Sequence, residues 1–361
     1  MFYHFILPLQ EHVSFLRLFQ YISFRSAYAA LTALVLVLLL GNIIIRWLRR
    51  MKLGEEIREL GPESHRSKAG TPTMGGLLIL GAVLVSILLW GNFRNHYLIV
   101  LAAATLLLGI LGFVDDYTKS ILKNKNGLPA RMKLFFQVAI ALAAALVIYY
   151  YPSNREYTTS LFIPFFNEAV LDMSYLWILF AVIVVVGSSN AVNLTDGLDG
   201  LAIGSVISVA VSLGIMAYLS GNVKIAAYLR IPYIPHGAEL TVFLSALTGA
   251  SIGFLWFNSN PASVFMGDTG SLALGGIVGL VAIMIKKEVF LFIVGGVFVV
   301  EALSVILQVV SYRLRKKRIF KMAPIHHHFE LSGWPEQKVV VRMWILGIIL
   351  AIFGLSSLKI L

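Results

Sequence analysis

Long apolar runs divide this chain, and most are about twenty residues long, the length that an α-helix needs to cross the hydrocarbon core of a bilayer. We expect about ten spans, with boundaries accurate to a few residues. They cover roughly residues 21–48, 74–92, 97–115, 132–151, 174–191, 200–219, 240–257, 270–285, 289–311 and 340–360. The alternating strands of an outer-membrane barrel have no counterpart here. The sequence therefore predicts an all-α, polytopic membrane protein with one integral membrane domain over residues 1–361.

The composition supports the same class. Of the 361 residues, 58% are hydrophobic and only 13% are charged, which excludes an ordinary soluble domain. Residues 1–19 lack the uniform apolar core of a signal peptide, so we expect an interfacial helix there. The chain has no cysteine, which excludes disulfides, thiol nucleophiles and thiolate metal sites.

Basic residues gather in alternate gaps between the spans. The gaps after the first, third and ninth spans hold Arg49, Arg50, Lys52, Arg58, Arg66, Lys68, Lys119, Lys123, Lys125, Arg131, Arg313, Arg315, Lys316, Lys317, Arg318 and Lys321. By the positive-inside rule these gaps are cytoplasmic, and both termini lie outside the cytoplasmic membrane. The net charge of +11 is thus mainly an orientation signal, and we expect no nucleic-acid partner.

Five polar clusters fall in every second gap, so a chain weaving through a bilayer would bring them all to one face. They are Ser64–Gly76, Asp115–Asp116, Asn190–Asp199, Gly267–Asp268 and His326–His328. We therefore expect one composite site at the cytoplasmic face.

The first cluster has two interpretations. Thr71 can cap the second span, with Pro72 in its first turn. Alternatively, unpaired backbone N–H groups, the positive end of the helix dipole, nearby basic residues and close-packing glycines form an anion-binding cradle.

Asp115 and Asp116 close the third span, where the helix dipole disfavours negative charge. A solvated helix end is one explanation. The other is that a positive group offsets the two carboxylates, and Mg²⁺ is the economical choice because it prefers carboxylate oxygens and accompanies phosphate substrates. Adjacent carboxylates also oppose each other's ionisation, which would make one of them a candidate base.

The densest cluster is Asn190–Gly200, in which Asn190, Asn193, Asp196 and Asp199 recur every three residues. A helical turn would project these side chains in one direction. Asp196 or Asp199 could instead cap the sixth span, but one cap needs only one acceptor. The surplus of polar groups favours a binding site.

Asp268 opens the eighth span, and Ser271 follows three residues later, a pattern that also fits a helix cap. Phe265 lies close by and is either a packing residue or a platform for stacking a base.

The histidines His326, His327 and His328 lie in the gap covering residues 312–339, and they lack the i, i+4 spacing of a helical metal site. In an extended segment His326 and His328 would face one way and His327 the other. Beside Lys321, such imidazoles suit contacts to a phosphorylated substrate. Glu301, inside the ninth span, must be paired, protonated or near a helix break, for which Gly295 and Gly296 are candidates.

These clusters resemble those of the bacterial phospho-N-acetylmuramoyl-pentapeptide transferases, in the same order and over essentially the whole chain. The matching segments are Gly70–Gly76, Asp115–Asp116, Asn190–Gly200, Val264–Asp268 and Met322–His328. The histidine triplet favours this family over its relatives that transfer N-acetylhexosamine phosphates.

The resemblance implies transfer of phospho-N-acetylmuramoyl-pentapeptide from UDP-N-acetylmuramoyl-pentapeptide to undecaprenyl phosphate, with Mg²⁺ as cofactor and a homodimer as the assembly. It implies that Asp268 holds the metal, with help from Asp115 or Asp116, and that these three are the catalytic residues. It further implies substrate contacts by Lys68, Thr73, Asn190, Asn193, Asp196, Asp199, Phe265, His326, His327 and His328, with the ring of Phe265 stacking on the uracil.

Three alternatives remain open at this point. A related transferase acting on N-acetylhexosamine phosphates would share most motifs. A secondary transporter would place its ligands near the bilayer midplane, whereas these carboxylates sit mostly at span ends. A non-catalytic scaffold would leave the clustering of carboxylates unexplained.

Overall fold

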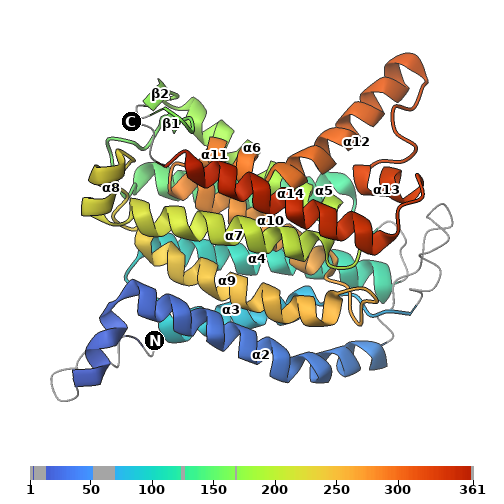
Figure 1. Cartoon of the computed structure of the whole chain (residues 1–361), viewed down its shortest axis with the longest axis horizontal. Helices are drawn as coiled ribbons and strands as arrows, with labels where there is room; N and C mark the ends of the chain where they lie inside the picture. Colours follow the sequence, from blue (N-terminus) through green and yellow to red (C-terminus); the bar gives the residue numbers. More distant parts are fainter. Residues whose placement is uncertain (1–2, 4–13, 52–69, 123–126, 167–168, 359–361) are drawn as a thin grey trace.

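The protein is a bundle of membrane-crossing helices, seen in a computed structural model that describes residues 3, 14–51, 70–122, 127–166 and 169–358 (Figure 1). Within these ranges nine helices are long and apolar enough to cross a membrane, which confirms the all-α polytopic fold. They are α2 (Ile22–Arg50), α4 (His96–Ser120), α5 (Ala130–Tyr150), α6 (Leu176–Thr195), α7 (Leu201–Ser220), α9 (Gly237–Asn258), α10 (Gly267–Met284), α12 (Gly296–Arg315) and α14 (Glu336–Ser356).

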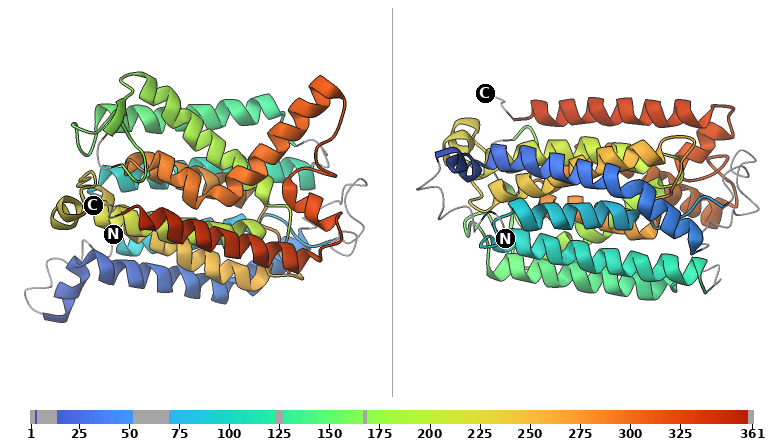
Figure 2. Two further views of the ribbon diagram at one scale, coloured as in Figure 1. Left: turned by 45° about the horizontal axis from the view of Figure 1, so that its top comes forward. Right: turned by 90° about the horizontal axis from the view of Figure 1, so that it is seen from below.

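Two expected spans differ from a single long helix. The second is α3 (Gly76–Trp90), which has only 15 residues. The ninth is broken at Gly295 into α11 (Glu288–Val294) and α12, as the two glycines of that span allow. Figure 2 shows α12 running away from the rest of the bundle.

Several short elements were not predicted. The connection between α5 and α6 contains an antiparallel hairpin, β1 (Ser160–Phe162) and β2 (Ala169–Asp172). A short helix, α8 (Val223–Leu229), follows α7, and another, α13 (Ile325–Glu330), follows α12. The described end of the expected interfacial segment is a 3₁₀ helix, η1 (Ser14–Gln20).

Helix α10 forms the core of the bundle. The helix is 89% buried inside the bundle, and it packs most extensively against α4 and α6. A helix that is apolar on all sides is stable only when neighbours surround it. Close approach needs small residues: a Cβ on Gly275 would lie 2.4 Å from the carbonyl oxygen of Ser188 in α6. The N-terminal end of α10 is therefore held rigidly, and it carries Asp268.

The N-terminal end of α2 and the C-terminal end of α14 lie at one end of the bundle (Figure 1). Helix α13 lies at the opposite end. Because successive spans alternate in direction, the C-terminal ends of α4 and α6 and the N-terminal end of α10 share that second end with α13. This is the arrangement that the alternation of polar clusters predicts.

Two buried ion pairs stabilise the end of the bundle where α2 begins and α14 ends. Arg25 Nη2 lies 2.8 Å from Glu239 Oε2, and Lys286 Nζ lies 3.0 Å from Glu288 Oε1. A buried carboxylate needs a partner of this kind because removal from water penalises its charge. These pairs hold helices together far from the polar clusters.

Candidate active site

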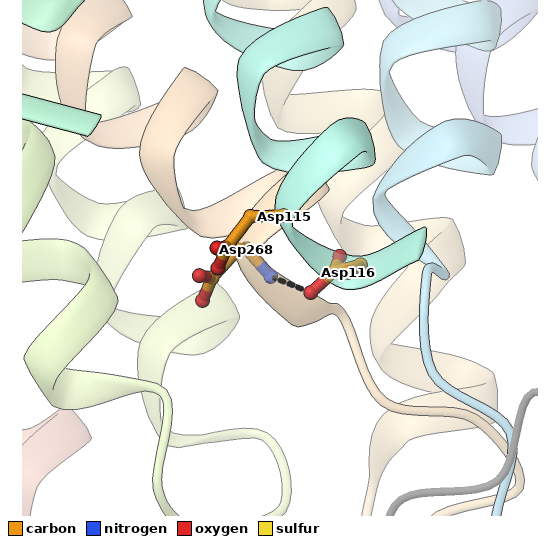
Figure 3. A group of neighbouring side chains, drawn as sticks. All are labelled: Asp115, Asp116 and Asp268. Carbon is orange, nitrogen blue, oxygen red and sulfur yellow. Dashed lines mark hydrogen bonds between the residues drawn. The ribbon is translucent and has the colours of Figure 1, made fainter. Parts of the chain in front are cut away.

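Three aspartates from two helices meet at the end of the bundle that carries α13 (Figure 3). Asp115 and Asp116 belong to the last turns of α4, and Asp268 belongs to the first turn of α10. One carboxylate oxygen from each of the three residues lies within 4.8 Å of the other two. Asp115 is fully buried, Asp116 is 4% exposed, and the side chain of Asp268 is 14% exposed.

Glycines allow the backbones around this cluster to approach closely. A Cβ on Gly112 of α4 would lie 2.2 Å from the carbonyl oxygen of Asp268, and a Cβ on Gly76 of α3 would lie 2.2 Å from the nitrogen of Gly270. Both distances are too short for any side chain. The glycines therefore determine how closely α3 and α4 pack against the first turn of α10.

Asp116 caps the N-terminus of α10. Its carboxylate accepts a hydrogen bond from the backbone N–H of Asp268 at 3.1 Å (Figure 3). It also accepts hydrogen bonds from the backbone N–H of Thr269 at 2.9 Å and from Thr269 Oγ1 at 2.7 Å. A carboxylate at a helix N-terminus is stabilised by unpaired N–H groups and by the helix dipole. The proposed Asp268–Ser271 cap is wrong, since Ser271 Oγ instead donates to the carbonyl of Gly267.

Asp115 and Asp268 share two lysine side chains. Lys119 Nζ lies 2.6 Å from Asp115 Oδ2 and 2.9 Å from Asp268 Oδ2. Lys133 Nζ lies 2.8 Å and 2.6 Å from the same two oxygens. The N–H of Leu128 adds a hydrogen bond to Asp115 Oδ1 at 2.7 Å. The positive charge that the sequence argument required is thus supplied in the protein itself by two ammonium groups.

From the sequence, Lys119 is expected only as a marker of membrane orientation, and Lys133 is not among the predicted site residues. Lys133 lies inside the expected fourth span, in the first turn of α5. A charged residue within an apolar run is a signal of function or of a buried partner. Glu301 was recognised from the sequence because it is a charged residue within an apolar run. Lys133 could have been recognised in the same way.

The chemistry of the cluster fits a hard divalent cation. Asp115 and Asp268 present converging carboxylate oxygens, and the two ammonium groups already mark the space between them as one that favours positive charge. Carboxylate oxygens are the protein ligands that Mg²⁺ prefers. The aspartate cluster can therefore hold a metal ion.

The segment before α3 pairs with the segment before α10. Phe265 N donates to the carbonyl of Pro72 at 2.8 Å, and Gly75 N donates to the carbonyl of Phe265 at 2.8 Å. Helix α3 begins at Gly76 without a side-chain cap, so the predicted Thr71 cap is wrong. The N–H groups of Gly75 and Gly76 are not unpaired either, because both bond carbonyls of residues 265–266.

This pairing brings two further candidates to the cluster. Thr73 is buried, and a Cβ on Gly267 would lie 2.7 Å from its Oγ1 and 2.6 Å from Asp116 Oδ2. Phe265 is half-buried. Lys68 lies outside the described residues.

The Asn190–Asp199 motif divides among several partners. Asn193 Nδ2 donates to Asp268 Oδ1 at 2.6 Å and to Ser271 Oγ at 2.8 Å, so Asn193 joins the aspartate cluster. Asn190 Nδ2 instead donates to Gln137 Oε1 and to the carbonyl of Val186. Only part of the motif thus faces Asp268.

The two aspartates of this motif lie beyond the end of α6. Asp196 is the half-buried C-cap residue of α6. Asp199 Oδ2 accepts hydrogen bonds from Ala262 N at 3.0 Å and Asn260 Nδ2 at 3.1 Å. Neither aspartate caps the next helix, because the N-cap of α7 is Gly200 in a left-handed conformation without a side-chain cap.

The three histidines lie in helix α13, so the predicted extended conformation is wrong. Consecutive helical residues point about 100° apart, and each histidine accordingly has its own partner. His326 Nδ1 lies 3.0 Å from Glu301 Oε2, and His327 Nδ1 lies 2.8 Å from Glu330 Oε2. His328 Nδ1 accepts from Lys321 N at 3.1 Å. Glu301 is paired, as its position in an apolar run required.

Carboxylates, ammonium groups and an amide thus form one charged cluster at this end of the bundle. Such a set can bind a cation and the phosphate oxygens that accompany it.

Comparison with known proteins identifies a family of transferases. Residues 98–286, more than half of the chain, match the model of glycosyl transferase family 4. Residues 68–80 match phospho-N-acetylmuramoyl-pentapeptide-transferase signature 1.

Proposed function

Because this chain belongs to glycosyl transferase family 4 and is a phosphoglycosyl transferase of the phospho-N-acetylmuramoyl-pentapeptide-transferase type, we propose that it makes lipid I. It transfers phospho-N-acetylmuramoyl-pentapeptide from UDP-N-acetylmuramoyl-pentapeptide to undecaprenyl phosphate and releases UMP. The observation that carries the proposal is the cluster of Asp115, Asp268, Lys119 and Lys133 at the end of the bundle. A lipid-borne acceptor and a water-soluble donor can meet only at such a membrane boundary.

In this reaction an oxygen of the acceptor phosphate bonds to the phosphorus that carries the sugar. The bond from that phosphorus to the bridging oxygen breaks, and UMP leaves with the bridging oxygen. Enzymes accelerate such phosphoryl transfers mainly by positioning the reactants and neutralising charge. Lys119 and Lys133 suit the second task, because their ammonium groups lie where negative charge already converges.

Asp115 and Asp268 are the residues that would hold Mg²⁺. When bound, the ion would polarise the phosphoryl oxygens and reduce their negative charge. Asn193 orients Asp268 through the hydrogen bond to Oδ1. The acceptor phosphate is already negatively charged near neutral pH, so a strong base is not required. Asp115 is the better placed of the adjacent pair to face the substrates, since Asp116 is engaged by the first turn of α10.

The remaining assignments describe the donor. We assign Thr73, Asp196, Asp199 and Lys68 to nucleoside and phosphate contacts, and Phe265 to stacking on the uracil. Asn190 supports this region from α6. We also assign His326, His327 and His328 of α13 to contacts with the sugar-phosphate part of the donor. In this proposal the site lies at the cytoplasmic face of the inner membrane, and both termini lie on the other side of that membrane. The enzyme works as a homodimer.

The test is a transfer assay with purified protein, undecaprenyl phosphate and Mg²⁺. UDP-N-acetylmuramoyl-pentapeptide should yield UMP and a lipid-linked product, whereas UDP-N-acetylhexosamine should yield neither. Chelation of the metal should abolish turnover, and added Mg²⁺ should restore it. Turnover of the hexosamine donor alone would identify the related transferase activity instead, and no release of UMP from either donor would contradict the proposal.

A further inference from the structure

Glu301 has no role in the proposed chemistry, yet it forms a fully buried pair with His326. Both residues are 0% exposed, although they are 25 positions apart in the chain and belong to different helices. His326 Nδ1 lies 3.0 Å from Glu301 Oε2. Burying a carboxylate is costly, so it persists where a partner compensates for the lost water. The pair therefore connects α12 to α13 at a specific point.

The other ring nitrogen of His326 lies against the Asn190–Asp199 motif. A Cβ on Gly197 would lie only 2.4 Å from His326 Nε2, so the ring packs directly on the backbone between Asp196 and Asp199. Among the residues that the structure describes, none forms a hydrogen bond with Nε2. A buried nitrogen without a partner is unfavourable, and a polar group of a ligand reaching this loop would relieve that cost.

Hydrogen-bonding rules determine which nitrogen carries a proton. A carboxylate can only accept, so Nδ1 must be the donor in the bond to Glu301. The bond fixes both the tautomer and the ring plane, and Nε2 is left as the atom directed at Gly197. Without the carboxylate, the ring could exchange tautomers and rotate.

Apolar packing holds the same elements in register. A separate cluster of buried apolar side chains lies beside α13. Its members include Leu198, just before α7, Leu201 at the start of α7, Val297 of α12, and Val339 and Val340 of α14. Ile325 and Phe329 of α13 pack against it. Val297 lies four residues before Glu301, on the same face of α12. Packing therefore sets where α13 sits, and the hydrogen bond from Nδ1 to Glu301 sets how the ring of His326 is turned.

We propose that Glu301 is a positioning residue for the transfer reaction: it orients His326 so that Nε2 faces the Asp196–Asp199 loop and the donor bound there. This inference rests on the proposed function, because it assigns the donor to that loop. Glu301 itself touches no substrate. Its effect passes through His326 alone, and this dependence makes the proposal testable.

A double-mutant cycle measures that dependence. Glu301→Leu should lower kcat/KM for the UDP-linked donor on the order of 10- to 100-fold, as loss of a carboxylate that orients a functional histidine does elsewhere. Glu301→Gln keeps a carbonyl acceptor for Nδ1–H and should recover part of the loss. In a His326→Asn background the same Glu301 changes should cause no further loss, because the residue through which they act is gone.

Glu288→Gln is the matched control. Glu288 is equally buried and pairs with Lys286 at the other end of the bundle. It should reduce thermal stability as the Glu301 variants do, yet leave kcat/KM within about twofold of the wild type. If Glu301→Leu does not fold, the cycle is carried out with Glu301→Gln. Histidine ¹⁵N spectra, assigned by the signals lost in His326→Asn, should show the fixed Nδ1–H form of His326 in the wild type and a tautomer mixture in the folded Glu301 variant.

The outcomes separate the two proposals. If the wild type releases UMP but the Glu301 and His326 effects multiply, or the Glu301 variants keep full activity, Glu301 is only structural and this inference fails. If the wild type releases no UMP, the proposed function fails first.

Discussion

At the scale of single residues, the adjacent aspartates Asp115 and Asp116 have different partners. Neighbouring positions on a helix point about 100° apart, so two identical side chains reach different surroundings. Asp115 meets Asp268 and two lysines, whereas Asp116 meets the N–H groups that open α10. Asp115 therefore belongs to the charged cluster with the lysines, and Asp116 joins the end of α4 to the first turn of α10.

Asp268→Asn should lower kcat at least about 100-fold, because the amide loses the negative charge that would bind a metal ion and interact with the lysines. The measurement is UMP release at saturating Mg²⁺, with thermal unfolding as a check that the variant is folded. Near wild-type turnover would show that Asp268 is not a metal ligand.

Asp116→Asn should destabilise the protein relative to the wild type. The amide nitrogen of asparagine cannot accept the hydrogen bonds that Asp116 receives from Asp268 N, Thr269 N and Thr269 Oγ1. We expect a loss of about 1–3 kcal/mol in the free energy of unfolding. Thermal or denaturant unfolding of the variant and the wild type in the same detergent provides the comparison, and equal stabilities would contradict the capping role.

At the scale of elements, the site is built where helix ends cross rather than within any one helix. The turn before α3 pairs with the turn before α10, and the end of α4 packs on the same turn. Each contact is made by backbone atoms or glycines, so the distance between helices is set by steric exclusion. A small increase in side-chain volume there should separate the carboxylates.

Two glycines in α3 provide a matched test of this packing. Gly76→Ala would place a Cβ 2.2 Å from Gly270 N, whereas Gly81 has no atom within 4 Å of its Cβ position. Gly76→Ala should cost about 1–3 kcal/mol of stability and should impair UMP release. Gly81→Ala should change stability by no more than about 0.5 kcal/mol. Indistinguishable variants in the unfolding and activity assays would show that α3 and α10 are not in close contact.

At the scale of the whole molecule, alternation of span direction brings residues far apart in the chain to one end. Asp116 and Thr269 are 153 positions apart and hydrogen-bonded, and His326 packs on Gly197. The end with the polar clusters also carries the exposed basic residues that follow α12. The positive-inside rule predicts that this end faces the cytoplasm.

The lack of cysteine makes this orientation easy to measure. Lys317→Cys marks the exposed stretch after α12, and Lys224→Cys marks the exposed helix α8 at the other end. A membrane-impermeant maleimide applied to intact cells that lack an outer-membrane barrier should label the Lys224 variant only. Labelling of Lys317→Cys alone would reverse the proposed orientation, and both should be labelled once the membrane is opened.

Hydrophobic spacing was enough to predict most spans, since a run of about twenty apolar residues has few alternatives in a bilayer. The helix break at Gly295 and the need for a partner at Glu301 also followed from local chemistry. The hairpin of β1 and β2, helix α8 and the helical form of α13 did not. These elements are too short to show a period, and their conformation depends on the helices around them.

What this sequence determined alone was the membrane class, the alternation of spans and the end of the bundle where the polar clusters meet, because all three depend on hydrophobicity and charge along the chain. Only the tertiary structure decided which of those residues touch. Lys133 joins Asp115, Asp116 caps α10, and Asn190 turns to Gln137, because helix packing sets the neighbours of each face. A linear pattern contains no information on the rotation of one helix against another, and these contacts depend on that rotation.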